Sequence, residues 1–249
     1  MSLPLWSIDQ LAILSDVHIG SAEHREKEFG ETIEHLSRHK IPTFLNGDIV
    51  ENVFAGLGRA DNEMLAGQTM NPTEQFKTAL AVLKPLIRRK LILGVTEGNH
   101  EARTVKRGGL DQADLFAHAL EVPYYGIGGM FRIKAGRQLY TIAIQHGSSF
   151  AKNPLLELRR MRDLYAEAEL YALGHNHHLS ADRDLHLGVD KRGVEVPKEK
   201  WLVRTGSYTE YPPYCRTKMA APQPIGSPIL SFSSDDHEIY VDTETLRWM

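Results

Sequence analysis

Short apolar runs that end in polar residues are the feature that most constrains how this 249-residue chain can fold. Five of them lead, directly or through a short turn, into clusters rich in glycine, histidine and acidic or amide residues. The clusters are Asp16-Val17-His18, Gly47-Asp48, Gly98-Asn99-His100-Glu101, His146-Gly147 and Gly174-His175-Asn176-His177. Short apolar runs bounded by such residues are typical of buried strands. Longer amphipathic segments separate several of these runs, so the sequence predicts an α/β domain with mixed sheets.

The rest of the sequence pattern predicts the individual strands and helices. The predicted strands are Leu11–Leu14, Pro42–Leu45, Leu91–Val95, Tyr140–Ile144, Leu170–Leu173, Trp201–Arg204, Ile229–Phe232 and Glu238–Val241. The predicted helices are Glu26–His39, Thr73–Arg89, Asp111–Leu120 and Leu155–Ala168, and Pro85 is expected to kink or end the second of them. Glycine-containing turns around 126–129 and 134–137 indicate a hairpin. We expect one domain spanning residues 1–249, with 178–228 as a loop-rich region that could cap a site.

The polar clusters are expected to meet. In open α/β sheets, ligands bind beyond the carboxyl ends of the strands. Strand ends of this kind would bring together seven residues with metal-binding side chains: Asp16, His18, Asp48, Asn99, His146, His175 and His177. Imidazole, carboxylate and amide groups without thiolate suit manganese, iron or zinc better than calcium.

Seven ligands are too many for one tetrahedral ion, but they suffice for two ions that share a carboxylate. Two ions about 3.5–4 Å apart can hold a hydroxide between them and clamp the phosphoryl oxygens of an in-line displacement. Two divalent charges against two carboxylates and one hydroxide leave a local excess of about +1, which attracts phosphate. The sequence therefore predicts two divalent metal ions, manganese above iron or zinc, and hydrolysis of a phosphate ester.

The same motifs, taken together from Leu11 to His177, resemble the calcineurin-like metallophosphoesterase family. The resemblance implies a four-layer α/β/β/α sandwich of two mixed sheets flanked by helices. It also implies which residues hold each ion. The first set is Asp16, His18, Asp48 and His177, and the second set is Asp48, Asn99, His146 and His175, with Asp48 bridging.

His100 is implied by the resemblance to contact the phosphate and protonate the leaving oxygen, a role that suits a group titrating near neutral pH. Glu101 is expected to support His100, or alternatively to be an ordinary carboxylate at a helix start. Glu51 is expected, at most, to contact a metal ligand without binding an ion itself. Arg103 follows closely and could neutralise a substrate phosphate, although a solvated position on the helix is the alternative.

The identity of the ester is less constrained. Protein phosphatases of the family continue Gly-Asp into Asp-Arg-Gly, whereas here Gly47-Asp48 is followed by Ile49-Val50-Glu51. We therefore favour a phosphodiester, with nuclease or nucleotide phosphodiesterase activity plausible. The alternative is a phosphomonoesterase acting on a small metabolite, and a non-catalytic scaffold is a weaker third. Aromatic residues of the late loop (Tyr208, Tyr211 and Tyr214) could stack on a base or pin the loop to the body.

Composition limits the partners. A formal net charge of −3 provides no general attraction to nucleic acid, so such a partner is possible but is not indicated by charge. Met1–Gln10 lacks the basic and apolar segments of a signal peptide, and no apolar run is long enough to span a membrane. The single cysteine, Cys215, excludes an intramolecular disulfide, which favours a cytoplasmic protein. The oligomeric state is left open.

Overall fold

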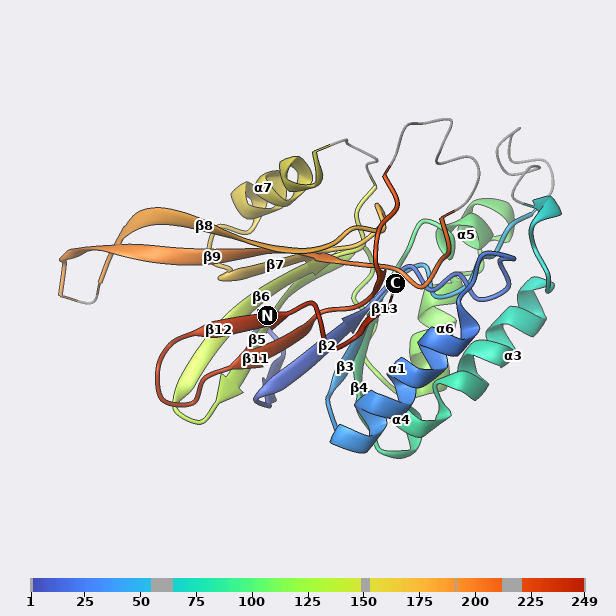
Figure 1. The fold of residues 1–249 in the computed structure, drawn as a ribbon, viewed down its shortest axis with the longest axis horizontal. Helices are drawn as coiled ribbons and strands as arrows, with labels where there is room; N and C mark the ends of the chain where they lie inside the picture. Colours follow the sequence, from blue (N-terminus) through green and yellow to red (C-terminus); the bar gives the residue numbers. More distant parts are fainter. Residues whose placement is uncertain (1, 55–64, 149–152, 191, 212–220, 249) are drawn as a thin grey trace.

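The computed structural model describes residues 2–54, 65–148, 153–190, 192–211 and 221–248, and Figure 1 shows its elements. The helices are α1 (Glu26–His39), α3 (Pro72–Val82), α4 (Lys84–Arg88), α5 (Ala102–Gly108), α6 (Gln112–Leu120) and α7 (Pro154–Leu164). The strands are β1 (Leu5–Ser7), β2 (Gln10–Leu14), β3 (Thr43–Asn46), β4 (Ile92–Thr96), β5 (Gly128–Ala135), β6 (Gln138–Gln145), β7 (Leu170–Leu173), β8 (Leu179–Val189), β9 (Glu195–Thr205), β10 (Ile225–Gly226), β11 (Ile229–Phe232), β12 (Ile239–Asp242) and β13 (Arg247–Trp248).

The larger strands form two mixed sheets. The five-stranded sheet has the order β12-β11-β2-β3-β4, and its strands β2, β3 and β4 are parallel. The six-stranded sheet has the order β1-β5-β6-β7-β9-β8, and its strands β6, β7 and β9 are parallel. The predicted hairpin is β5–β6, and its strands pair in antiparallel register. Each sheet therefore contains a parallel group whose carboxyl ends share one edge.

Four layers result from the way the apolar side chains are buried. One core lies between the sheets and joins residues such as Ile13 and Phe44 to Ile142 of the opposite sheet. A second core packs α1, α3, α4 and α6 against the outer face of the five-stranded sheet. A third core packs Leu158 and Met161 of α7 against the outer face of the six-stranded sheet. The predicted α/β/β/α sandwich of two mixed sheets is confirmed.

The helices begin and end where local chemistry requires it. α1 has the predicted bounds, with acidic residues in its first turn and basic residues in its last, as its dipole favours. α3 begins with a reciprocal capping box between Asn71 and Glu74. The predicted helix Thr73–Arg89 is interrupted at Leu83, because Pro85 is accommodated only in the first turn of the new helix α4.

The region 178–228 differs from the prediction. Its first half is a long antiparallel hairpin of β8 and β9, each of 11 residues, instead of a loop-rich segment. Figure 1 shows the outer half of this hairpin extending beyond the sandwich. In that half Leu185, Leu187 and Val189 alternate with His186 and Gly188 at the period of a strand, and these apolar side chains are exposed to solvent. Among the described helices, none is both long and apolar enough to cross a membrane.

Candidate metal centre

Six of the seven predicted ligands, Asp16, His18, Asp48, His146, His175 and His177, come together at the carboxyl ends of the parallel strands, and Asn99 follows the end of β4. Asp16, Asp48, His146 and His175 are all buried, and His18 is 5 % exposed. The five-stranded sheet supplies its ligands from the ends of β2, β3 and β4, and the six-stranded sheet supplies its ligands from the ends of β6 and β7. Because the sheets pack face to face, the site is built from both.

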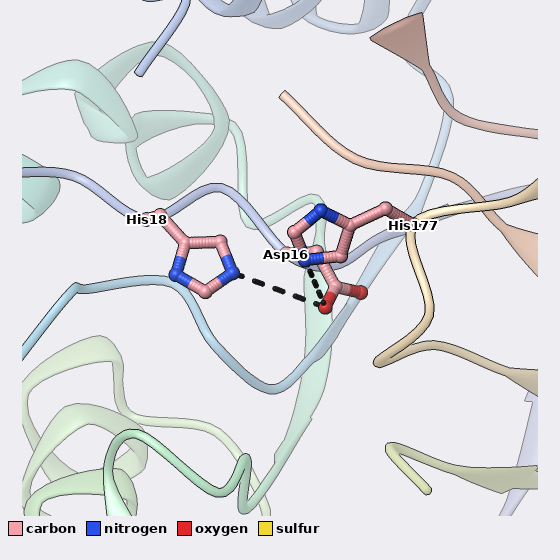
Figure 2. Close-up of side chains that lie close together, drawn as sticks. All are labelled: Asp16, His18 and His177. Atoms are coloured by element: carbon pink, nitrogen blue, oxygen red, sulfur yellow. Dashed lines mark ion pairs between the residues drawn. The ribbon is translucent and has the colours of Figure 1, made fainter. Parts of the chain in front are cut away.

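The first cluster joins Asp16, His18 and His177, whose ligand atoms all lie within 4.8 Å of one another. Figure 2 shows both imidazole rings directed toward the Asp16 carboxylate. Asp16 Oδ1 lies 3.5 Å from His177 Nε2 and 4.0 Å from His18 Nε2. One carboxylate oxygen and two imidazole nitrogens thus surround a common point, as ligands of one cation do.

The second cluster joins Asp48, His146 and His175, again with ligand atoms within 4.8 Å. Asp48 Oδ2 lies 3.0 Å from His146 Nε2. The same oxygen is 4.0 Å from Nε2 of His18, which belongs to the first cluster. Asp48 therefore stands between the clusters, where a bridging carboxylate would be required.

A third grouping brings the candidate acid to the same place. His18, Asp48 and His100 also have ligand atoms within 4.8 Å, and His100 Nε2 lies 3.8 Å from Asp48 Oδ2. The backbone N–H of His100 donates to Asp48 Oδ1 at 2.8 Å. The structure thus places His100 beside the carboxylate shared by the two clusters.

The backbone at the ligands is strained. Five of the seven residues adopt the left-handed conformation, with φ values of 53° at Asp16, 53° at His18, 51° at Asp48, 70° at His175 and 58° at His177. Left-handed backbone costs roughly 1–2 kcal/mol for a residue with a side chain. Strain of this kind is concentrated at functional sites, where the surrounding structure holds it in place. The glycines in the motifs serve the same geometry, since a Cβ at Gly98 would collide with the backbone nitrogen and carboxylate of Asp48.

Each of three histidines is oriented through its second ring nitrogen. His18 Nδ1 lies 2.8 Å from Glu51 Oε2, and His177 Nδ1 lies 3.0 Å from Thr209 Oγ1. His146 Nδ1 donates to the carbonyl oxygen of Asn46 at 2.8 Å. These contacts leave Nε2 facing the cluster in each case, as outer partners of metal-bound histidines do.

Glu101 has different partners from those predicted. Its buried carboxylate accepts hydrogen bonds from the backbone N–H groups of Asp48 and Ile49, both at 2.8 Å, and from that of Gly98 at 3.2 Å. It therefore braces the turn that carries Asp48, and no hydrogen bond of the described structure joins it to the imidazole of His100. The sequence shows that residue 101 is acidic, but it does not show that its carboxylate contacts the turn at Asp48.

His100 is enclosed by Glu51 and Arg103. His100 Nδ1 lies 2.6 Å from the carbonyl oxygen of Glu51, and Arg103 places Nη1 2.9 Å from that nitrogen and Nη2 3.3 Å from His100 Nε2. Burial lowers the pKa of His100 to about 4, against the opposing charge of Asp48. Half-buried Arg103 therefore lies beside His100, and its predicted contact with a substrate phosphate stays a prediction.

The charges of the site are strongly coupled. Burial alone would lower the pKa of His18, but the hydrogen bond and charge of Glu51 outweigh it and raise that pKa to about 9. Burial also opposes the charge of His146, yet Asp48 and Asp16 raise its pKa to about 10. Burial would raise the pKa of Asp48, but His146 and His100 hold it well below its usual range. The carboxylates thus attract positive charge, which a divalent cation supplies in place of protons.

The donor atoms fit metal ions. Among the residues that the structure describes, the buried ligand atoms without a hydrogen-bond partner include Asp16 Oδ1, His18 Nε2 and Asn99 Oδ1. Buried polar atoms are nearly always satisfied, and an exception calls for a missing partner such as an ion. Oxygen and imidazole nitrogen donors converging from two sheets are a suitable set for manganese, iron or zinc.

Tyr208, the first aromatic residue of the late loop, does not contribute to a stacking surface, which was one of two predicted alternatives. Tyr208 is fully buried, and its hydroxyl donates to Thr32 Oγ1 at 3.1 Å. It pins the loop to α1, as the second alternative stated. Tyr211 is half-buried, and Tyr214 lies outside the described residues.

Comparison with known proteins finds similar folds at low identity. No protein-family model matches the chain, and no curated protein matches it. Among solved structures, zinc-complexed Vps29 from Entamoeba histolytica is 12 % identical with a TM-score of 0.42, covering 94 % of this chain and 97 % of that one. The hypothetical protein PH1004 from Pyrococcus horikoshii is 11 % identical with a TM-score of 0.49, covering 94 % and 87 %. A predicted phosphoesterase from Streptococcus pneumoniae is 14 % identical with a TM-score of 0.40, covering 94 % and 88 %.

Since the identities and TM-scores are low, the class of this chain is drawn from its own residues. Its four layers, its strand-end motifs and its histidine and aspartate clusters agree with one another. They are the features that the resemblance to the calcineurin-like metallophosphoesterases implies. The chain therefore has the fold and the candidate metal clusters of this class of protein.

Proposed function

We propose that this protein is a metal-dependent phosphoesterase that hydrolyses a phosphodiester. The observation that carries the proposal is the pair of ligand clusters, linked by Asp48 and adjacent to His100, in one buried site. A scaffold would need neither the complete ligand set nor His100. A single structural zinc would need only four ligands and would leave the others unexplained.

In this proposal the site holds two ions. Asp16, His18, Asp48 and His177 would hold one ion, and Asp48, Asn99, His146 and His175 would hold the other. When bound, such ions polarise phosphoryl oxygens and lower the pKa of water. Manganese suits the donor set, with iron or zinc as alternatives. The single cysteine of the chain favours a reducing compartment such as the cytoplasm.

His100 and Arg103 act on the substrate. The Glu51 carbonyl oxygen can only accept a hydrogen bond, so His100 Nδ1 carries a hydrogen and directs Nε2 toward Asp48. In the protonated imidazolium Nε2 also carries a hydrogen, which passes to the leaving oxygen and leaves His100 neutral with its hydrogen on Nδ1. The Arg103 guanidinium, already beside that nitrogen, supplies positive charge for the non-bridging oxygens of the phosphate.

The choice between a diester and a monoester substrate rests on fewer observations than the metal-dependent hydrolysis itself. The missing Asp-Arg-Gly continuation after Gly47 separates this chain from protein phosphatases and favours a diester, such as that of a nucleic acid or a nucleotide. Arg103 favours the second candidate, a phosphomonoesterase on a small metabolite, because a monoester carries more negative charge at the same position. Both candidates use the same ligands and the same His100.

The test is turnover of matched chromogenic phosphate monoesters and diesters by the Mn²⁺-loaded protein. Asp48→Asn is the blank, and Asp184→Asn is the matched control, because Asp184 pairs with Arg162 on the outer face of the β8–β9 hairpin. Diester turnover lost in the blank and kept in the control is the expected result. A preference for monoesters would favour the second candidate, the phosphomonoesterase, over the phosphodiesterase. Absence of metal-dependent turnover of both esters would contradict the proposal that this protein is a phosphoesterase.

A further inference from the structure

Arg204 is the largest fully buried side chain among the described residues, although it carries a charge. It lies near the end of β9 on the face that packs against α7, two residues beyond Leu202. A buried charge is costly unless it is paired and hydrogen-bonded. Arg204 meets this condition, because its Nη2 lies 3.3 Å from Glu157 Oε2 on α7 and its Nη1 donates to the carbonyl oxygen of Gly174 at 3.0 Å.

The pair reaches two loops of the candidate metal centre. Gly174 directly precedes His175. On the other side, Glu157 Oε1 accepts the backbone N–H of Ser148 at 3.1 Å, and Ser148 lies two residues after His146. One ion pair therefore ties together the loops that carry His146 and His175. These two histidines share a single cluster with Asp48.

The Asp16–His18–His177 cluster also has anchors of its own. His18 is oriented by Glu51, and His177, although it follows Gly174 in the same loop, has its own anchor at Thr209. Asp16 Oδ2 accepts from the hydroxyl of Ser15 and from the backbone N–H of His175.

Stability alone does not explain such a pair. Replacing a buried ion pair by apolar residues of similar volume is often neutral or stabilising, whereas removal of one partner is strongly destabilising. An apolar pair between α7 and β9 would extend the core that Leu158, Met161 and Leu202 already form. It would give up the hydrogen bonds to the two ligand loops.

We propose that the Arg204–Glu157 ion pair positions His146 and His175, and so sets the affinity of the Asp48–His146–His175 cluster for its metal ion. The inference rests on the proposed function, in which that cluster holds an ion. Arg204 and Glu157 are positioning residues, because they act through the loops that carry the ligands.

The experiment is titration of the metal-free full-length chain with Mn²⁺ by calorimetry, together with thermal unfolding. The double variant Arg204→Met/Glu157→Met removes both charges at once, so it should unfold near the wild-type temperature. We expect one of the two ions to bind about 10–100-fold more weakly, the usual effect of losing outer partners of metal ligands, while the other is unchanged. Arg204→Lys, which can still donate to Gly174 and pair with Glu157, should recover part of the loss.

The matched control is Arg162→Met/Asp184→Met, an ion pair of the same helix α7 with the same sheet that contacts no ligand loop. Both of its affinities should equal those of the wild type. If the Arg204→Met/Glu157→Met variant folds and binds both ions normally, or weakens both equally, the inference is wrong. If that variant does not fold, Glu157→Gln decides between the same outcomes. A wild-type chain that binds no ion would overturn the proposed function and this inference together.

Discussion

The two clusters of the metal centre have the same composition but different surroundings. Each contains one aspartate from the five-stranded sheet and at least one histidine from the six-stranded sheet. In the Asp16–His18–His177 cluster, the side chain of His177 is 24 % exposed and is anchored by the hydroxyl of Thr209. In the Asp48–His146–His175 cluster every member is buried. One cluster is therefore partly open to solvent, whereas the other is enclosed by the protein.

Asp48→Asn should have the largest effect, because Asp48 belongs to the enclosed cluster and also approaches His18 and His100. We expect weakened binding of both ions and nearly complete loss of turnover, measured by metal analysis after dialysis and by esterase assay. Retention of both ions with full activity would show that the two clusters do not share this carboxylate.

His100→Asn separates chemistry from metal binding. The variant should keep both ions, because the assigned ligand sets do not include His100, and should lose roughly two to four orders of magnitude in kcat, the range for a general acid. Metal content and kcat are measured on the same preparation. Wild-type turnover would assign the proton transfer to another group.

Glu51→Gln sharpens the comparison by acting on one cluster only. Gln keeps an oxygen within reach of His18 Nδ1 but loses the charge that raises the His18 pKa. We expect one ion to bind about 10–100-fold more weakly, with the enclosed position unaffected. Calorimetric titration with Mn²⁺ provides both affinities. Equal weakening of both ions would mean that the clusters are not supported independently.

Thr209→Val should have the smallest effect. It removes a neutral hydroxyl from a half-buried histidine while preserving the shape of the side chain, and such a hydrogen bond contributes about 0.5–1.5 kcal/mol. We expect the affinity of the open position to fall by about 2–10-fold in the same titration. A change as large as that of Glu51→Gln would show that exposure of His177 does not reduce the importance of its anchor.

Much of the fold and of the site was predictable from local pattern. Strands such as Leu170–Leu173 and Ile229–Phe232 have the predicted bounds, since short apolar runs in a sandwich core show the strongest signal. The outer half of the β8–β9 hairpin was missed, although Leu185, Leu187 and Val189 alternate there with His186 and Gly188 in the period-two pattern of a strand. The anchor of His177 was missed as well, because Thr209 lies 32 residues away and a lone threonine shows no pattern.

By itself, the sequence determined which residue types end each buried strand, and therefore which groups could meet at the sheet edge. The order of glycines and histidines is enough to predict these metal-binding groups, because each motif is complete within a few residues. Only the tertiary structure decided how the groups are shared and supported: Asp48 between the clusters, Glu101 under the Asp48 turn, and Arg204 buried beneath Gly174. The physical reason is that hydrogen bonds and ion pairs between distant segments depend on the packing of two sheets, which local sequence does not encode.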